Sequence, residues 1–152
     1  MPAPPLPVTR EGHRPAMRPS SRQPLPSPRR IFICDDDGAF ASELTEALSG
    51  QGFAVAALDP SKRPVHQIMA FQPDVLLLDI YMPPPDGFEI VNHLHGTEGS
   101  REMTLVLMSG AAMDLLGVAT RFCLARNLRV AGSFQKPLKL AELVRACNAR
   151  LP

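Results

Sequence analysis

Residues 75–87 read Val-Leu-Leu-Leu-Asp-Ile-Tyr-Met-Pro-Pro-Pro-Asp-Gly, an apolar run that ends in an acid and passes into a proline-rich loop. Consecutive large apolar residues bounded by such a loop indicate a strand that is buried on both faces. Strands of this kind occur in parallel sheets that helices cover on both sides. The stretch therefore predicts an α/β protein with Asp79 at the carboxyl end of a central strand.

Short apolar runs recur along the chain and alternate with segments of helical spacing. The other runs are 31–34, 53–58, 105–108 and 130–134, and the Ala-rich run 53–58 is expected at a sheet edge. The alternation predicts a (βα)5 fold, a doubly wound five-stranded parallel sheet in the order 2-1-3-4-5, flavodoxin-like, within a three-layer sandwich. The helices are expected from Asp37 to Gly50, at 61–71, at 87–95, at 112–127 and from Leu140 to Cys147.

The first 30 residues differ in composition from the rest of the chain. The 152 residues, 45% of them apolar, suffice for one globular domain. Residues 1–30 hold nine Pro and six Arg against Glu11, net +5, whereas residues 31–152 carry net −4. We therefore predict a disordered Pro/Arg-rich tail over residues 1–29 and a folded domain over 30–152. The tail either docks a partner through its Pro-Pro-Leu-Pro pieces or has no role.

Charge, hydropathy and cysteine usage exclude several classes of protein. A formal net charge of +1 gives no field that would recruit nucleic acid or a membrane surface. No run approaches the roughly 18 apolar residues of a membrane span, and no apolar signal segment begins the chain. The three Cys are too few and too scattered for a disulfide framework or a CxxC metal site. We expect a cytoplasmic protein with reduced thiols and no membrane partner.

Acidic residues follow two of the predicted strands directly. Asp35, Asp36 and Asp37 end the run 31–34, as Asp79 ends the run 75–78. In a doubly wound sheet these two strand ends flank the crevice where ligands bind. Carboxylates gathered there repel one another unless a cation neutralises them, and oxygen ligands suit Mg²⁺. The pattern predicts a Mg²⁺ site, although a lone acid pair at a strand end more often caps a helix. That capping role is the one we assign to Asp37.

Two further polar groups end the last two strands. Ser109 follows the run 105–108, and Lys136, before Pro137, follows the run 130–134. A carboxylate, a hydroxyl, a fixed ammonium and a cation site together suit phosphoryl transfer, because that chemistry depends on positioning and charge neutralisation.

Residues 30–150 resemble the receiver domain of two-component response regulators, here of the stand-alone type. The resemblance rests on motifs in the family's order, each at a strand end or in the loop that follows: Asp35-Asp36, Asp79, the loop Asp79-Ile-Tyr-Met-Pro83 with Asp86-Gly87, Ser109, and Lys136-Pro137.

The resemblance implies a phosphorelay protein rather than an enzyme. Asp79 would accept a phosphoryl group from a histidine kinase or phosphotransfer protein. Mg²⁺ would be held by the side chains of Asp36 and Asp79 and the backbone carbonyl of Tyr81, with Asp35 acting mainly through water. Lys136 would contact free Asp79 and later a phosphoryl oxygen, and Ser109 would hydrogen-bond another. The Lys136–Pro137 peptide would be cis.

The chain departs from the family at the fifth strand. Many members carry an aromatic residue three places before the Lys, where this chain has Ser133. Phe134, one place later, is expected on the opposite face of the strand. The output is expected on the face of the fourth helix, fifth strand and fifth helix, which is also where a homodimer would form.

Two other functions stay open. Because no further domain follows the fifth predicted helix, we expect no DNA binding and an unknown downstream protein target. A pseudo-receiver would be a phosphorylation-independent scaffold, a reading that Ser133 and the triple Pro motivate. A phosphatase using Asp79 as nucleophile is disfavoured, because no cap or substrate domain is present.

Overall fold

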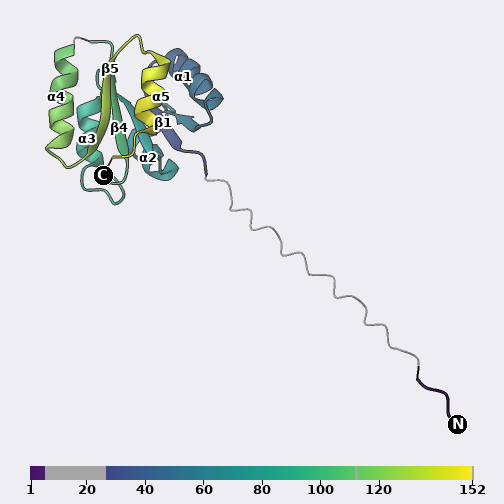
Figure 1. Ribbon diagram of the computed structural model, residues 1–152. Helices are drawn as coiled ribbons and strands as arrows, with labels where there is room; N and C mark the ends of the chain where they lie inside the picture. Colours follow the sequence, from purple (N-terminus) through teal and green to yellow (C-terminus); the bar gives the residue numbers. More distant parts are fainter. Residues whose placement is uncertain (6–26, 112, 152) are drawn as a thin grey trace.

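A five-stranded parallel sheet forms the centre of the computed structural model, which describes residues 1–5, 27–111 and 113–151 (Figure 1). The strands run in the order β2-β1-β3-β4-β5, which confirms the predicted fold class and topology. The elements are β1 (Arg30–Cys34), α1 (Gly38–Gly50), β2 (Ala54–Ala57), α2 (Pro64–Phe71), β3 (Val75–Asp79), α3 (Gly87–Leu94), β4 (Thr104–Ser109), α4 (Met113–Leu124), β5 (Arg129–Gln135) and α5 (Leu140–Asn148).

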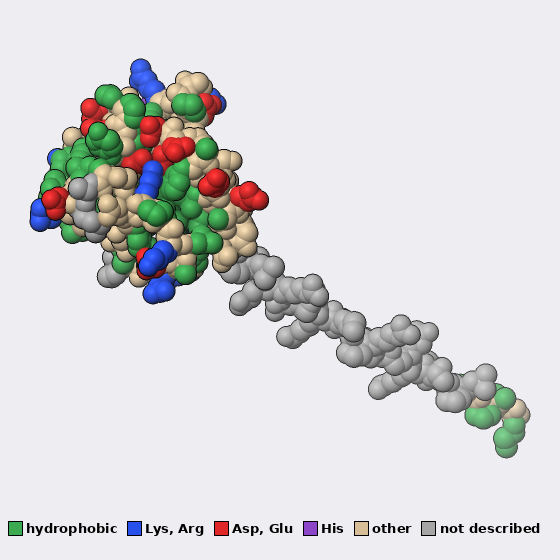
Figure 2. All heavy atoms as spheres, turned by 90° about the horizontal axis from the view of Figure 1, so that it is seen from above, with side chains coloured by type: hydrophobic (Ala, Val, Ile, Leu, Met, Phe, Trp, Pro, Cys, Tyr) green, Lys and Arg blue, Asp and Glu red, His purple; other side chains and the backbone are tan. Residues whose placement is uncertain are grey.

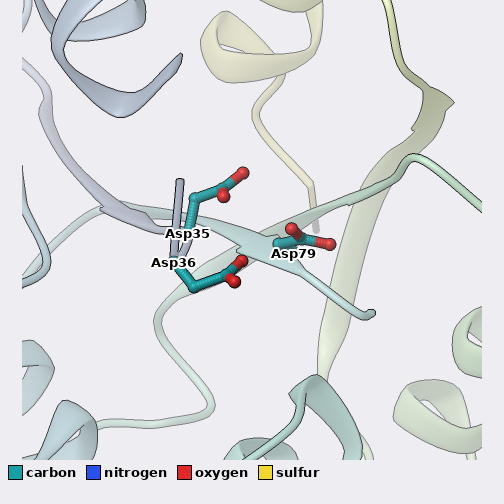
Figure 3. Close-up of side chains that lie close together, drawn as sticks. All are labelled: Asp35, Asp36 and Asp79. Carbon is teal, nitrogen blue, oxygen red and sulfur yellow. The ribbon is translucent and has the colours of Figure 1, made fainter. Parts of the chain in front are cut away.

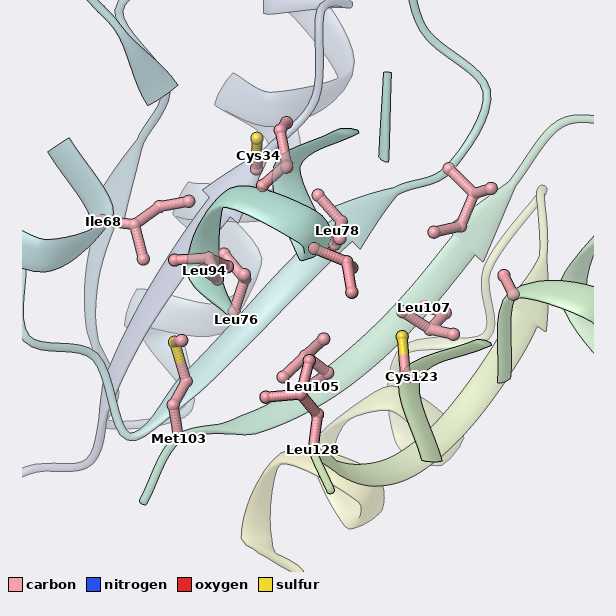
Figure 4. Packing of buried hydrophobic residues seen from close by; sticks show 14 of the residues in the cluster. Cys34, Ile68, Leu76, Leu78, Leu94, Met103, Leu105, Leu107, Cys123 and Leu128 are labelled. Carbon is pink, nitrogen blue, oxygen red and sulfur yellow. The ribbon is translucent and has the colours of Figure 1, made fainter. Parts of the chain in front are cut away.

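Helices cover both faces of the sheet and create two apolar clusters. Successive strand residues point to opposite faces, so Leu76 and Leu78 pack toward α2, α3 and α4, while Leu77 packs toward α1 and α5 (Figures 1 and 4). Every residue of β3 and β4 is buried, whereas β2 is partly exposed at the edge, as its Ala-rich sequence predicts. The three cysteines are buried and unpaired.

The second and fourth helices are shorter than predicted. α2 begins at Pro64 rather than residue 61, because proline favours the first helical turn and Gln67 bonds both backbone groups of Asp59 to hold the preceding loop. α4 ends at Leu124, and Asn127 has a φ of 59°, the left-handed conformation that ends helices. The predicted start at residue 112 lies outside the described residues.

A bulge in β5 decides which side chains face α4 and which face α5. Leu105 pairs with Val130 but Val106 pairs with Gly132, so one extra residue, Ala131, enters the strand. A Cβ on Gly132 would lie 2.9 Å from the Phe134 ring and 3.7 Å from the Ala146 side chain on α5. Phe134 packs in the α1–α5 cluster. By alternation Ser133 faces α4, so the prediction that Phe134 occupies the opposite face is confirmed.

The predicted tail is described only at its two ends, because residues 6–26 lie outside the described part of the chain. Arg29, the last residue of the predicted tail, contacts the folded body: its Nη2 donates a hydrogen bond of 3.2 Å to the carbonyl of Ala149. Among the described residues, no helix is both long and apolar enough to cross a membrane.

Candidate functional site

The carboxyl ends of β1 and β3 bring three acids together. Asp35, Asp36 and Asp79 each offer a carboxylate oxygen within 4.8 Å of the others, although 43 residues separate Asp36 from Asp79 (Figure 3). Parallel pairing of Cys34 with Leu78 aligns the two strand ends. Figure 2 looks onto this end of the molecule and shows acidic side chains gathered near the middle of the surface.

The three consecutive acids after β1 have three different environments. Asp35 is buried, and its Oδ1 accepts a hydrogen bond of 2.9 Å from the backbone N–H of Asp37. Asp36 is exposed. Asp37 caps α1, since its Oδ1 accepts a bond of 3.1 Å from the N–H of Phe40. The capping role predicted for Asp37 is therefore confirmed, and Asp36 leaves one side of the acid cluster open to solvent.

Asp79 is buried, with 3% of its surface exposed. Its Oδ1 accepts a 3.1 Å hydrogen bond from the N–H of Tyr81, and its Oδ2 lies 3.1 Å from Lys136 Nζ. Burial and the nearby charge of Asp35 raise the pKa of Asp79 to about 6, against the opposing effect of Lys136 and the Tyr81 N–H. Burial and the charge of Asp35 together therefore outweigh the stabilisation of the Asp79 carboxylate by Lys136.

Lys136 bridges two of the acids from the end of β5. Its Nζ lies 2.6 Å from Asp35 Oδ2 as well as 3.1 Å from Asp79 Oδ2, and 4.3 Å from the centre of the Phe40 ring. Burial lowers the pKa of the Lys136 ammonium, but the two carboxylates outweigh burial and raise it. The Asp79 contact is the one that the family resemblance implies. Sequence reasoning missed the Asp35 ion pair and the Phe40 contact, because no spacing rule joins residues about a hundred positions apart.

Ser109 ends β4 beside this cluster and is fully buried. Its Oγ accepts a 3.0 Å hydrogen bond from the N–H of Ala111, and its carbonyl accepts one of 2.8 Å from the N–H of Lys136. A second bond of 3.3 Å joins Gln135 Nε2 to the carbonyl of Ala111. The β4–α4 loop is thus tied to the Ser109 hydroxyl on one side and to the end of β5 on the other.

The loop after β3 is closed by Asp86 and Gly87. Asp86 caps α3 through a 2.9 Å bond from the N–H of Glu89, and the N–H of Gly87 donates to the carbonyl of Ile80 at 3.2 Å. A Cβ on Gly87 would lie 2.6 Å from the Cα of Ile80, so only glycine fits there. These roles are structural, and the sequence analysis assigned none to the pair. The Pro84–Pro85 and Lys136–Pro137 peptides are cis, the second as the resemblance implies.

The donor set fits Mg²⁺. All three candidate ligands that the structure brings together are carboxylates, and hard oxygen ligands are those that Mg²⁺ prefers. Three carboxylates beside one ammonium leave excess negative charge, which an added cation would neutralise. Exposed Asp36 leaves room for the waters that Mg²⁺ retains. The structure thus brings together every predicted site side chain at one edge of the sheet, and coordination by the Tyr81 carbonyl stays a prediction.

Residues 31–148 match the sequence model of a known protein family, the response regulator receiver domain. Among curated relatives, the DNA-binding response regulator MtrA of Mycobacterium tuberculosis is 29% identical over 123 residues, which are 81% of this chain and 50% of MtrA. The response regulator MprA of the same species is 37% identical over 68 residues, 45% of this chain and 30% of MprA. The chain thus spans half or less of the length of these relatives.

Solved structures agree with this match. A response regulator from Colwellia psychrerythraea is 28% identical with a TM-score of 0.63, covering 78% of this chain and 93% of that chain. The chemotaxis protein CheY4 of Vibrio cholerae superposes with a TM-score of 0.66 over 78% of this chain and 94% of its own. Its 16% identity shows likeness of fold alone.

Proposed function

The chain belongs to the response regulator receiver family, and from that premise we propose that it accepts a phosphoryl group on Asp79 and signals through phosphorylation-dependent protein contacts. The observation that carries the proposal is the contact of Lys136 Nζ with Asp79 Oδ2 at 3.1 Å, inside a cluster of three carboxylates. A nucleophile, a fixed cation and a candidate metal site then share one crevice.

The reaction is a transfer between two nucleophiles. A carboxylate oxygen of Asp79 forms a bond to phosphorus as the phosphorus–nitrogen bond of a donor phosphohistidine breaks, and the leaving imidazole takes up a proton. The side chains of Asp36 and Asp79 would hold Mg²⁺ with the Tyr81 carbonyl, Asp35 would act mainly through water, and the ion would neutralise charge on the transferring group. Lys136 Nζ needs only a short movement from Asp79 Oδ2 to hydrogen-bond a phosphoryl oxygen.

Ser109 would transmit the phosphorylation of Asp79 to the β4–α4 loop. Its hydroxyl oxygen accepts a hydrogen bond from the N–H of Ala111, and its own O–H would donate to a phosphoryl oxygen on Asp79 once the side chain turned toward that group. Reorientation of the Ser109 hydroxyl would leave the Ala111 N–H without its acceptor and free the start of the β4–α4 loop. We place the output surface on α4, β5 and α5, where a downstream protein or a second copy of the chain would bind.

The partners follow from the family. Receiver domains receive their phosphoryl groups from histidine kinases or phosphotransfer proteins, and this family signals rather than turning over a substrate. The chain described here would therefore perform self-phosphorylation and hydrolysis of its own aspartyl phosphate only. DNA binding belongs to MtrA by its name and is not proposed for these residues.

Intact mass after incubation with acetyl phosphate and Mg²⁺ tests the proposal. The wild type should gain one phosphoryl adduct, which EDTA abolishes, and Asp79→Asn should gain none. Asp37→Asn is the matched control, because it makes the same chemical change at an exposed cap and Asn also caps helices. It should be labelled like the wild type. An unlabelled wild type, or an equal adduct on Asp79→Asn, would contradict the proposal.

A further inference from the structure

The aromatic ring of Phe40 lies against the one ammonium of the site. Phe40 is the third residue of α1, and its ring centre is 4.3 Å from Lys136 Nζ. The ring is partly buried, and the ammonium touches it on one side and the carboxylates of Asp35 and Asp79 on the other. A cation this close to an aromatic face is attracted by the negative potential of that face.

The contact belongs to a closed circuit of interactions. Asp35 Oδ1 accepts the N–H of Asp37 at 2.9 Å, and Asp37 Oδ1 accepts the N–H of Phe40 at 3.1 Å. The Phe40 ring contacts Lys136 Nζ, which returns to Asp35 through Oδ2 at 2.6 Å. The cap that begins α1 therefore also sets the position of the ring relative to the acid that Lys136 binds.

Without the ring, the lysine would have space to leave the site. A groove of about 610 Å³ between α1 and the start of α5 is bordered by Phe40 and Lys136 themselves, and otherwise mostly by apolar side chains of both helices. A lysine side chain has a flexible stem of four carbons and loses rotamer freedom when it is held in one geometry. Phe40 and Lys136 both line this groove, which also has the carboxylate of Glu43 on its wall, so an ammonium that the ring did not attract would be free to turn toward Glu43.

We propose that Phe40 is a positioning residue that confines the Lys136 ammonium between Asp35 and Asp79, ready to meet a phosphoryl group. The inference rests on the proposed function and deepens it, because the ring acts through Lys136 and touches no reacting atom. It also connects the α1–α5 groove to the phosphoacceptor through Lys136, since Phe40 lines the groove and contacts the ammonium that binds Asp79.

Fluorination of the ring tests the role while keeping its shape. Site-specific 3,4,5-trifluorophenylalanine at position 40 weakens the negative face of the ring, and Phe40→Leu removes that face. With acetyl phosphate and Mg²⁺, the rate constant for phosphorylation should fall roughly two- to fivefold in both variants, the size expected of one partly exposed cation–π contact. Phe40→Tyr, which keeps the aromatic face, should restore the wild-type rate.

A double-mutant cycle and a spectroscopic signal separate positioning from packing. In a Lys136→Ala background the ring substitutions should leave the rate unchanged. The ε-methylene protons of Lys136 should resonate upfield in the wild type through the ring current and lose that shift in Phe40→Leu. A rate constant that is unchanged by fluorination, or that falls equally in the Lys136→Ala background, would overturn the positioning role of Phe40 but not the proposed function. A wild type that takes up no phosphoryl group would overturn the proposed function, and the methylene shift would still report on the contact.

Discussion

Two regions of the same sheet differ in how well their residues match the receiver family's pattern. One is the carboxyl edge of β1 and β3, and the other is the second half of β5. At the first, Asp35, Asp36 and Asp79 lie within reach of one cation. At the second, Ser133 stands where many family members carry an aromatic residue, and the Phe134 ring packs on the α1–α5 face. The three acids thus come together although Ser133 replaces the aromatic residue that many family members carry.

The difference between these two regions also indicates which element would change conformation when Asp79 is phosphorylated. Phe134 fills the space above Gly132 and beside Ala146, so its movement would disturb α5 rather than open a path toward α4. The β4–α4 loop, by contrast, is held directly by the Ser109 hydroxyl. We therefore propose that the output of this chain begins at Ala111.

Gly87→Ala should have the largest effect on stability, because it disrupts the backbone packing at the carboxyl end of β3. The new Cβ would lie 2.6 Å from the Cα of Ile80 and 2.9 Å from the carbonyl oxygen of Asp79, both backbone atoms that cannot move aside alone. We expect the free energy of unfolding to fall by about 3 kcal/mol, measured by urea denaturation. A loss below about 1 kcal/mol would show that the loop after β3 is looser than described.

Asp79→Asn should stabilise the metal-free protein in a pH-dependent way. The folded-state pKa of Asp79 is about 6, above the ordinary 3.8, because the carboxylate is buried beside Asp35. The folded state then binds the proton more tightly, so the wild type loses stability as the pH rises from about 3.8 to about 6. In EDTA at pH 7.5, Asp79→Asn should be more stable by up to about 3 kcal/mol, and the gap should close near pH 4.

Chemical denaturation at several pH values measures this gap. A gap independent of pH would contradict the electrostatic cause.

Asp36→Ala should weaken Mg²⁺ binding by at least about tenfold, because it removes one of three carboxylates that face a common point. Isothermal titration of the free protein measures the affinity. The neighbouring cap variant Asp37→Asn should bind like the wild type. Equal affinities for wild type and Asp36→Ala would show that Asp36 is not a ligand of the ion.

Gly132→Ala should have the smallest effect, since its Cβ would meet the end of the Phe134 side chain rather than backbone. We expect a loss of about 1 kcal/mol in unfolding free energy, as the ring turns aside. Phosphorylation at Asp79 should be unchanged, because neither Gly132 nor Phe134 is among the groups that hold Asp79 or the Lys136 ammonium. A large loss of phosphorylation would break the proposed separation between the two regions.

Most of the fold could be predicted because parallel strands buried on both faces are continuous apolar runs, as in Val75 to Leu78 and Leu105 to Met108. The location of the site followed, since strands that run parallel place the residues after them at one edge. What could not be predicted depends on side-chain directions across the sheet. Lys136 and Asp35 are 101 residues apart, and only their rotamers make a 2.6 Å contact.

The bulge in β5 could not be predicted from the sequence either. Ala131 and Gly132 both face α5, a two-against-one arrangement that a period-two pattern cannot express. Phe40 shows the same limit, because its helical spacing predicts an apolar face without predicting that Lys136 would lie over the ring.

A beryllofluoride titration in the presence of Mg²⁺, followed by amide NMR spectra, tests whether Asp79 accepts a phosphoryl group, because beryllofluoride on an aspartate mimics that group. We expect saturable shifts at Asp79 and Lys136 that spread to Ala111 and α4, and none in Asp79→Asn. Spectra that do not change would contradict a phosphorylated receiver and favour a scaffold whose partner binding is independent of phosphorylation.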